Sequence, residues 1–243
     1  MRSLARDLDD LGFVPLTSHS TGVPAFEYLA SVRGWAPEHV AQAAERFWLR
    51  YNPRTRCLVI PHLANGHLVH WTERTIESGH RRRYRSMDRY RPEPPDDQAQ
   101  RFTVYDADAV CAGGAVLFIC EGPLDAIALW LAGADLGVVA TALFGAWASP
   151  IQLALLRGVR SLYQRVFVLL DADAVGQGLG LAGQLGVGAI TLSVVDDDPA
   201  KMSFDDRRRL IAYAAESDEQ HIRWSPVGGC PRRPPQRREA PCQ

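Results

Sequence analysis

The sequence predicts an α/β protein in which a parallel sheet, covered by helices on both faces, follows a smaller α+β unit. After residue 114, apolar runs without polar alternation are each followed by a helix-like segment, as in buried parallel sheets. Before residue 78, helical spacing gives way to two strand-like runs around a tight-turn signal. The proline-rich stretch PEPPDD (92–97) separates these patterns and is the expected loop or hinge.

The first 22 residues lack a clear pattern and are expected to form a flexible N-terminus. The stretch VPAFEYLASVRGWAPEHVAQAAERF (23–47) predicts two short helices. Its apolar residues fall at helical spacing, Gly34 interrupts the first helix, and Pro37 suits the first turn of the second.

Residues 56–76 predict a β-hairpin, because two strand-like runs surround the turn signal Asn65-Gly66. Three histidines, His62, His67 and His70, flank that turn. They have no further ligand nearby in the sequence, so we expect polar surface residues rather than a metal site.

The second half alternates strongly between strand and helix. The predicted strands are 115–120, 136–141, 166–170 and 189–195, and the predicted helices are 123–133, 149–158, 174–186 and 203–217. Ser149 and Pro150 suit the N-cap and first turn of one helix. The Pro/Arg-rich tail 225–243 is expected to be disordered.

Composition narrows the class of protein. With 47% hydrophobic and 23% charged residues, the chain is typical of soluble globular proteins, and its apolar runs are too short to cross a bilayer. Its N-terminus has no signal-peptide pattern, so a cytosolic location is expected. The five cysteines form no C-x-x-C pair or Cys/His cluster, so we expect neither disulfides nor zinc.

The segment GHRRRYRSMDRYR (79–91) is strongly basic, with six arginines against a single acid, Asp88. On composition alone, a solvated loop and a nucleic-acid contact explain it equally well. Arginine binds phosphates bidentately, and Trp71, Tyr84 and Tyr90 could stack on unpaired bases.

Acidic residues follow three of the predicted strands. Glu121 ends the first with Asp125 four residues later, Asp171 and Asp173 end the third, and Asp198 closes a run of three after the fourth. A lone acid there is usually a helix cap. Three such positions at one sheet edge would repel one another without a cation, and oxygen ligands suit Mg²⁺.

The motifs FICEGPLDAIAL and VFVLLDADAVGQ resemble the E-G-x-x-D and D-x-D signatures of the Toprim domain, which lie on Rossmann-like strands. The intervening VVATALFGAWASPIQLALL is similar to a segment of bacterial primases, from which it departs at Phe144 and Trp147. VVDDDPAKMSFDD resembles the third acidic stretch of the family; Asp198 matches, whereas the next acid is displaced to Asp205 or Asp206.

The first half resembles the catalytic core of DnaG-type primases. AFEYLASVRGWAPEHVAQAAERF is similar to its Y-L-x-x-R-G-L helix pair, and RRRYRSM to its basic segment, with Arg83 and Tyr84 matching. The hairpin positions that match are Arg56, Pro61, Gly66 and Arg74. The resemblance spans residues 23 to 217.

This resemblance implies a division of the chain into parts. Residues 23–110 would form the basic N-terminal primase-core subdomain and 111–200 the Toprim domain. Residues 201–224 would form the C-terminal helix, between that domain and the disordered tail.

The resemblance also implies a nucleotidyltransferase that makes short RNA primers on single-stranded DNA. Asp171 and Asp173 would hold Mg²⁺ or Mn²⁺ with Asp198 as an additional ligand, and Glu121 would act as a metal ligand or general acid/base. Asp125 and Gly122 would orient the site without touching the metal. The residues expected to bind nucleotide or DNA are Arg74, Arg81, Arg82, Arg83, Tyr84 and Arg85.

The implied partners are NTPs, a single-stranded DNA template, a replicative helicase and a separate zinc-binding module, with no membrane. Primases without their own zinc module are encoded by phages and mobile elements, and the bacterial cytosol is the expected location. Two alternatives remain open: a Toprim nuclease that hydrolyses phosphodiesters with the same metals, and a non-catalytic nucleic-acid-binding subunit of a replisome.

Overall fold

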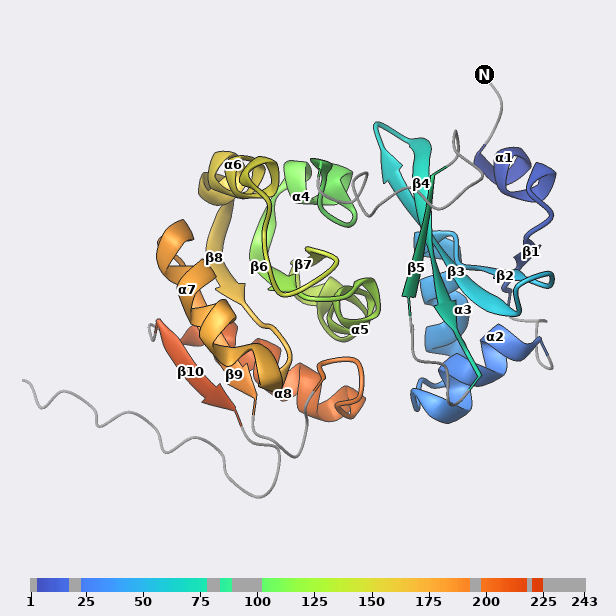
Figure 1. Ribbon diagram of the computed structural model, residues 1–243. Coiled ribbons are helices and arrows are strands. Elements are labelled where there is room, and N and C mark those ends of the chain that lie inside the picture. Colours follow the sequence, from blue (N-terminus) through green and yellow to red (C-terminus); the bar gives the residue numbers. More distant parts are fainter. Residues whose placement is uncertain are drawn as a thin grey trace, which may run out of the picture.

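A computed structural model of the chain describes residues 4–17, 23–77, 84–88, 102–192, 198–217 and 220–224. Its framework is two five-stranded sheets, one antiparallel and one parallel, with helices packed between and around them (Figure 1). The predicted α/β class is therefore confirmed.

The antiparallel sheet belongs to the first half of the chain and has the order β1-β2-β3-β4-β5. Its strands are β1 (Val14–Pro15), β2 (Arg50–Asn52), β3 (Cys57–Ala64), β4 (His67–Thr75) and β5 (Tyr84–Asp88). The predicted hairpin is β3–β4, and Asn65 and Gly66 take positive φ values of 52° and 70° at its turn. Both central residues of a type I′ turn require such angles.

Three helices accompany this sheet: α1 (Leu4–Asp10), α2 (Pro24–Glu27), which continues into a π-helical turn (Tyr28–Val32), and α3 (Pro37–Phe47). The predicted helix pair is confirmed. Gly34, with φ +67°, separates the two helices, and Pro37 stands in the first turn of α3.

The prediction of a flexible N-terminus is wrong for residues 4–17. Leu8 on α1 is fully buried and packs with Phe13, Val59 and Trp71 against the back of the hairpin. The burial of Trp71 also excludes its suggested stacking on bases. Part of the basic segment forms β5, an edge strand paired with β4.

The parallel sheet has the order β10-β9-β8-β6-β7, and all four of its strand pairs are parallel. Its strands are β6 (Gly114–Cys120), β7 (Val138–Ala142), β8 (Tyr163–Val168), β9 (Gly188–Leu192) and β10 (His221–Trp224). In chain order this is a 2-1-3-4-5 arrangement, whose connections diverge between β6 and β8. Ligands of such sheets bind at that switch point, outside the carboxyl ends of the strands.

Helices cover both faces of the parallel sheet. They are α4 (Ala107–Ala112), α5 (Pro123–Gly133), α6 (Pro150–Val159), α7 (Val175–Leu185) and α8 (Phe204–Glu216). Phe118 and Cys120 of β6 pack in the core that contains α5 and α8, whereas Leu117 and Ile119 pack in the core with α4, α6 and α7. This two-sided burial explains the unbroken apolar runs.

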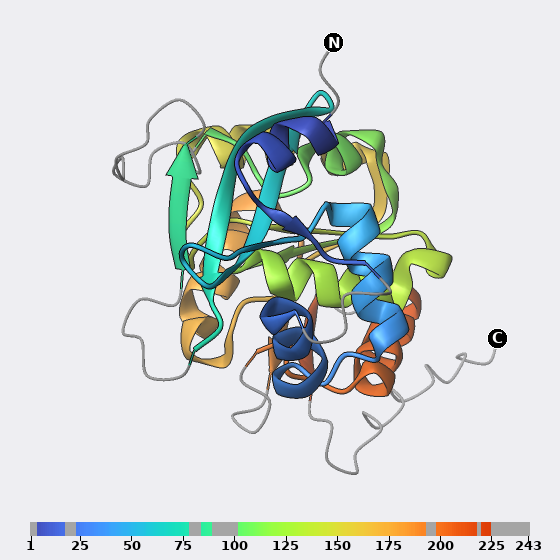
Figure 2. The same cartoon turned by 90° about the vertical axis from the view of Figure 1, so that its right-hand side faces the viewer.

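Helix α5 lies between the two sheets, next to α3 (Figure 1). Seen from the side of the antiparallel sheet, α3 lies in front of the parallel-sheet part of the molecule (Figure 2). One continuous hydrophobic core joins residues of both halves, among them Phe26, Leu29, Phe118 and Leu124.

The expectation that all three hairpin histidines lie on the surface is wrong for two of them. His62 and His70 are each only 2% exposed, and their ring centroids are 3.9 Å apart. The His62 ring also stacks on Phe144 at 4.5 Å. Only tertiary packing of the hairpin against the loop after β7 encloses them, while His67 is exposed.

The C-terminal part differs from prediction in one respect: beyond α8 the chain adds an unpredicted strand, β10, to the edge of the parallel sheet. The expected hinge at 92–97 and the tail at 225–243 lie outside the described residues. Among the described helices, none combines the length and the apolar character needed to span a bilayer.

Candidate metal centre and its surroundings

The acidic residues expected at the sheet edge do gather there. Glu121 directly follows β6, and Asp171 and Asp173 follow β8, so both strands of the switch point deliver carboxylates to one place. Parallel neighbours end at the same edge, which is why residues 50 apart in the chain meet.

The carboxylates form two groups in which the ligand atoms all lie within 4.8 Å of one another. One group comprises Glu121, Asp171 and Asp173, and the other comprises Asp125, Asp171 and Asp198. Asp171 belongs to both and is placed to bridge them. The donor set is entirely oxygen and partly exposed, and therefore fits a hard cation such as Mg²⁺.

Crowding affects the ionisation of Glu121. Partial burial raises the pKa of its carboxyl, and the negative charges of Asp173 and Asp198 raise it further. Like charges held this close disfavour one another, and a bound cation would relieve that repulsion.

Asp125 supports the turn that presents Glu121. Its Oδ2 accepts a hydrogen bond from the Gly122 amide at 3.0 Å and so caps the start of α5. Burial, followed by the neighbouring Asp198, raises the pKa of the Asp125 carboxyl well above its ordinary value. The same carboxyl also belongs to one of the two acidic groups, with Asp171 and Asp198.

Gly122 lies close to two side chains, those of Asp125 and Tyr84. A Cβ atom there would lie 2.9 Å from Asp125 Oδ2 and 3.7 Å from the hydroxyl of Tyr84. The first of these distances is too short, so a larger residue would push the Asp125 carboxyl away from the Gly122 amide that it caps.

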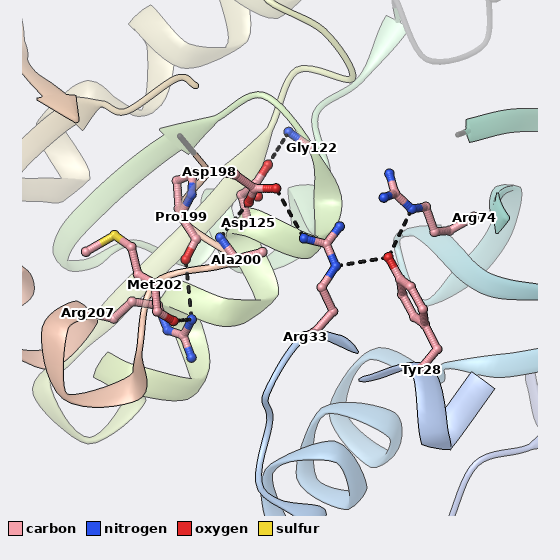
Figure 3. Close-up of polar contacts among 10 residues, drawn as sticks. All are labelled: Tyr28, Arg33, Arg74, Gly122, Asp125, Asp198, Pro199, Ala200, Met202 and Arg207. Atoms are coloured by element: carbon pink, nitrogen blue, oxygen red, sulfur yellow. Dashed lines mark hydrogen bonds and ion pairs between the residues drawn. The ribbon is translucent and has the colours of Figure 1, made fainter. Parts of the chain in front are cut away.

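Asp198 is held by an arginine from the other half of the chain (Figure 3). Arg33 Nη1 donates to Asp198 Oδ2 at 3.1 Å, and the Ala200 amide donates to Asp198 Oδ1 at 2.8 Å. Burial opposes ionisation of Asp198, but the hydrogen bond from Asp125 and the Arg33 charge outweigh it and lower the pKa of Asp198.

Arg33 continues into a chain of polar contacts that joins the antiparallel half to the acidic edge (Figure 3). Its Nε donates to the Tyr28 hydroxyl at 3.0 Å, and Arg74 Nε on β4 donates to the same oxygen at 3.2 Å. Burial works against the charge of Arg33, yet Tyr28 and Asp198 together raise its pKa. Arg33 therefore stays a cation.

Arg33 and Tyr28 were missed as site residues. The available signal was the stretch YLASVRG (28–34), which is similar to the Y-L-x-x-R-G motif but has one more residue between Leu29 and Arg33. Sequence alone could not show that they meet an aspartate 165 positions away.

Among the residues expected to bind nucleotide or DNA, some are buried, some are exposed, and some lie outside the described part of the chain. Arg74 is only 8% exposed and lies over the Tyr84 ring at 4.5 Å, which argues against direct contact of Arg74 with a DNA strand. Arg85 is exposed on β5, and Arg81, Arg82 and Arg83 lie outside the described residues.

The displaced acids of the third motif do not join the cluster. Asp205 and Asp206 lie in the first turn of α8, where Ser203 accepts from the Asp206 amide. They act as helix-start residues, as negative charge at an N-terminus favours.

A cavity of about 930 Å³ opens beside the acidic edge, within the range of small-molecule sites. Glu121 and Gly122 line one end. The loop between β7 and α6, residues 143–149, lines much of the rest. Phe102, Trp147 and Ile151 add exposed apolar surface to it.

The chain resembles known proteins in its fold rather than in its sequence. No protein-family model matches the chain, and no curated protein sequence matches it. Solved structures do resemble it, and their likeness places the chain in a fold class, that of DnaG-type primase catalytic domains.

Three structures illustrate this. A DnaG primase catalytic domain bound to single-stranded DNA has a TM-score of 0.56 at 17% identity, covering 88% of this chain and 80% of that one. The RNA polymerase domain of Mycobacterium tuberculosis primase DnaG gives 0.55 at 17%, covering 86% and 82%. The primase fragment of the bacteriophage T7 primase-helicase gives 0.54 at 14%, covering 76% and 72%.

Proposed function

We propose that this chain is the catalytic core of a DNA primase, which makes short RNA primers from NTPs on a single-stranded DNA template. The observation that carries the proposal is the meeting of Glu121, Asp171 and Asp173 at the switch point of the parallel sheet. The likeness of the fold to primase catalytic domains, one of them bound to single-stranded DNA, supports it.

The metal ligands in this proposal are Glu121, Asp171 and Asp173, with Asp198 as an additional ligand for Mg²⁺ or Mn²⁺. A bound divalent cation would draw the triphosphate toward the primer hydroxyl and neutralise the charge that develops on the transferred phosphate. Asp125 and Gly122 would fix the turn that presents Glu121.

The domain assignment follows the same reasoning. We assign residues 111–200 to the Toprim type, because their parallel sheet presents the E-G-x-x-D and D-x-D acids at one edge. Residues 23–110 would form the primase-core subdomain, with the polar chain through Tyr28 and Arg33 joining it to the acids.

The basic segment would contact the template or the triphosphate. Arginines at 81, 82, 83 and 85 would neutralise phosphates, as the exposure of Arg85 permits. Arg74 and Tyr84 would support this surface from beneath, since Arg74 is buried. A replicative helicase and a separate zinc-binding module are the proposed protein partners, and a phage or mobile element the proposed origin.

The test is synthesis of labelled RNA on single-stranded DNA by the purified chain, alone and with its replicative helicase, in Mg²⁺ or Mn²⁺. Asp171→Ala, Asp173→Ala and Glu121→Gln should each lower the rate of nucleotide addition by about 100-fold or more, because each removes a carboxylate that would hold the cation at the reacting phosphate. Asp205→Ala, an exposed acid outside the cluster, is the matched control and should keep full activity.

The same reactions without NTPs examine the alternatives. Metal-dependent cleavage of DNA in these reactions would indicate a nuclease, provided that the reactions with NTPs give no RNA even when the helicase is added. Binding of DNA without either product would indicate a non-catalytic subunit.

A further inference from the structure

Trp147 is unusually exposed for a tryptophan. Its exposed fraction is 76%, whereas Trp35, Trp71 and Trp224 are at most 6% exposed. The remaining two, Trp48 and Trp130, are half-buried. An isolated exposed leucine would need no explanation, but the largest apolar side chain left in solvent at the rim of a cavity indicates a binding surface.

The loop that carries Trp147 is held firmly at both ends. At its start, the Leu143 amide donates to the Cys120 carbonyl and the Gly145 amide to the Glu121 carbonyl, each at 3.1 Å. At its end, Gln152 donates to the carbonyl of Leu143 and also bonds the Ser149 amide through its Oε1. The exposed tryptophan therefore sits on an anchored support that is bonded directly to the strand end bearing Glu121.

The backbone of the same loop is strained at Phe144. Phe144 has φ +63°, a left-handed angle that is strained for a bulky residue. Its ring is fixed by stacking on buried His62. Trp147 is exposed, so its side chain adds no core packing that would offset the strain of this loop.

Trp147 borders two hollows. One is the 930 Å³ cavity beside Glu121, where Phe102 and Ile151, 60% and 46% exposed, provide further apolar surface. The other, of about 340 Å³, lies against the start of α7 and is lined by Gly176 and Gln177. An indole with space on two sides can accept a flat ring.

The charges of the large cavity identify the kind of ligand. Among its described lining residues, Glu121 is the only charged one, and the others are apolar or neutral. The cavity wall itself is thus unsuited to a phosphate. A ligand that placed phosphates at the metal-binding acids and a flat, neutral ring against Trp147 would match both ends of the site.

We propose that Trp147 is a base-stacking residue, and that the 143–149 loop with Phe102 and Ile151 receives a nucleobase next to the acidic edge. This inference rests on the proposed function, since it takes the phosphates at the acids to be those of a nucleotide. The base can belong to an incoming NTP or to the single-stranded template, and both present the same aromatic face.

The experiment measures binding without turnover, using the full chain in Mg²⁺ and two pairs of ligands. The first pair is a single-stranded oligonucleotide and the same backbone with abasic sites. The second is ATP and inorganic tripolyphosphate. The variants are Trp147→Ala and Trp147→Phe, with Leu162→Ala as the control because Leu162 is 47% exposed but lies outside both hollows.

Trp147→Ala should weaken binding of a base-containing ligand by roughly 5- to 100-fold, the range expected for one stacked base. Trp147→Phe should restore most of it, and Leu162→Ala should change nothing. Affinity for the abasic strand and for tripolyphosphate should be unaffected by Trp147→Ala. Loss with ATP alone assigns the base to the incoming nucleotide, and loss with the oligonucleotide alone assigns it to the template.

The inference is overturned if Trp147→Ala binds both ATP and the oligonucleotide as the wild type does. It is equally overturned if the substitution weakens the base-free ligands as much as the base-containing ones, since the effect would then be structural. Failure of primer synthesis with Trp147-dependent binding intact would remove the proposed enzyme activity and leave the stacking site standing.

Discussion

At the scale of single residues, Arg33 has two tasks. It offsets the charge of Asp198, and it ties Tyr28 of the antiparallel half to the acidic edge. Because Arg33 is only 8% exposed, solvent reaches little of its ion pair with Asp198. The acidic cluster of the metal-free protein therefore depends on a residue from outside the parallel sheet.

We accordingly predict that Arg33→Ala lowers the free energy of unfolding by about 3 kcal/mol in metal-free buffer, because it leaves the partly buried Asp198 carboxylate without its ion-pair partner. Urea unfolding followed by circular dichroism measures this. Arg208→Ala is the matched control: its ion pair with Asp135 is exposed and should contribute little. Equal stability of the two variants would contradict the importance given to the Arg33–Asp198 pair.

At the scale of elements, the β3–β4 hairpin encloses a pair of buried histidines, His62 and His70. His62 Nε2 lies 2.8 Å from the Thr72 hydroxyl, and its ring is packed between His70 and Phe144. Burial, with a smaller contribution from His70, lowers the pKa of His62 well below its ordinary value. The unfolded chain therefore binds a proton at His62 more readily than the folded one does.

This difference makes stability depend on pH with a definite sign. Above the unfolded histidine pKa of about 6.5, the burial of His62 does not reduce the free energy of unfolding. As the pH falls below that value, the unfolded chain takes up a proton at His62 and the free energy of unfolding decreases. Urea unfolding at several pH values between about 7 and 5 should show this loss, and His62→Gln should reduce its slope. His67→Gln, at an exposed position on the same hairpin, should leave the slope unchanged. If the stability of His62→Gln depends on pH as steeply as that of the wild type, His62 is not the cause of the loss.

At the scale of the whole molecule, the two halves share one core. Phe47 of α3 packs edge-on against Trp130 of α5 at 5.1 Å and stacks on Tyr105 at 5.9 Å. The tip of the hairpin is attached as well, because the amides of Asn65 and Gly66 both donate to Asp108 of α4, at 2.8 and 3.0 Å. We expect the halves to fold and unfold as one cooperative unit.

Phe47→Ala tests this expectation. Truncation of a buried phenylalanine costs about 3–5 kcal/mol, and in a single cooperative unit that loss shifts the whole transition. Far-ultraviolet circular dichroism and tryptophan fluorescence should then report the same midpoint, lower than that of the wild type. Two separate transitions, with only one of them moved by the substitution, would show that the halves are independent.

The sequence by itself determined the order and type of most elements. Local signals sufficed for the hairpin at Asn65-Gly66 and for the start of α6 at Ser149, which caps the helix through the Gln152 amide. Unbroken apolar runs likewise indicated β6 and β8 and therefore placed Glu121 and Asp171 at strand ends. Such signals involve residues within a few positions of each other, so they can be recognised along the chain.

Tertiary structure alone decided which distant residues meet. Helix α1 and strands β5 and β10 are stable because they pack or pair with segments far away in the sequence, so no local pattern reveals them. The Arg33–Asp198 pair joins positions 165 apart, and the burial of His62 and the exposure of Trp147 both depend on where one loop lies over the hairpin. Burial and charge pairing are properties of the assembled surfaces, and a one-dimensional pattern does not contain them.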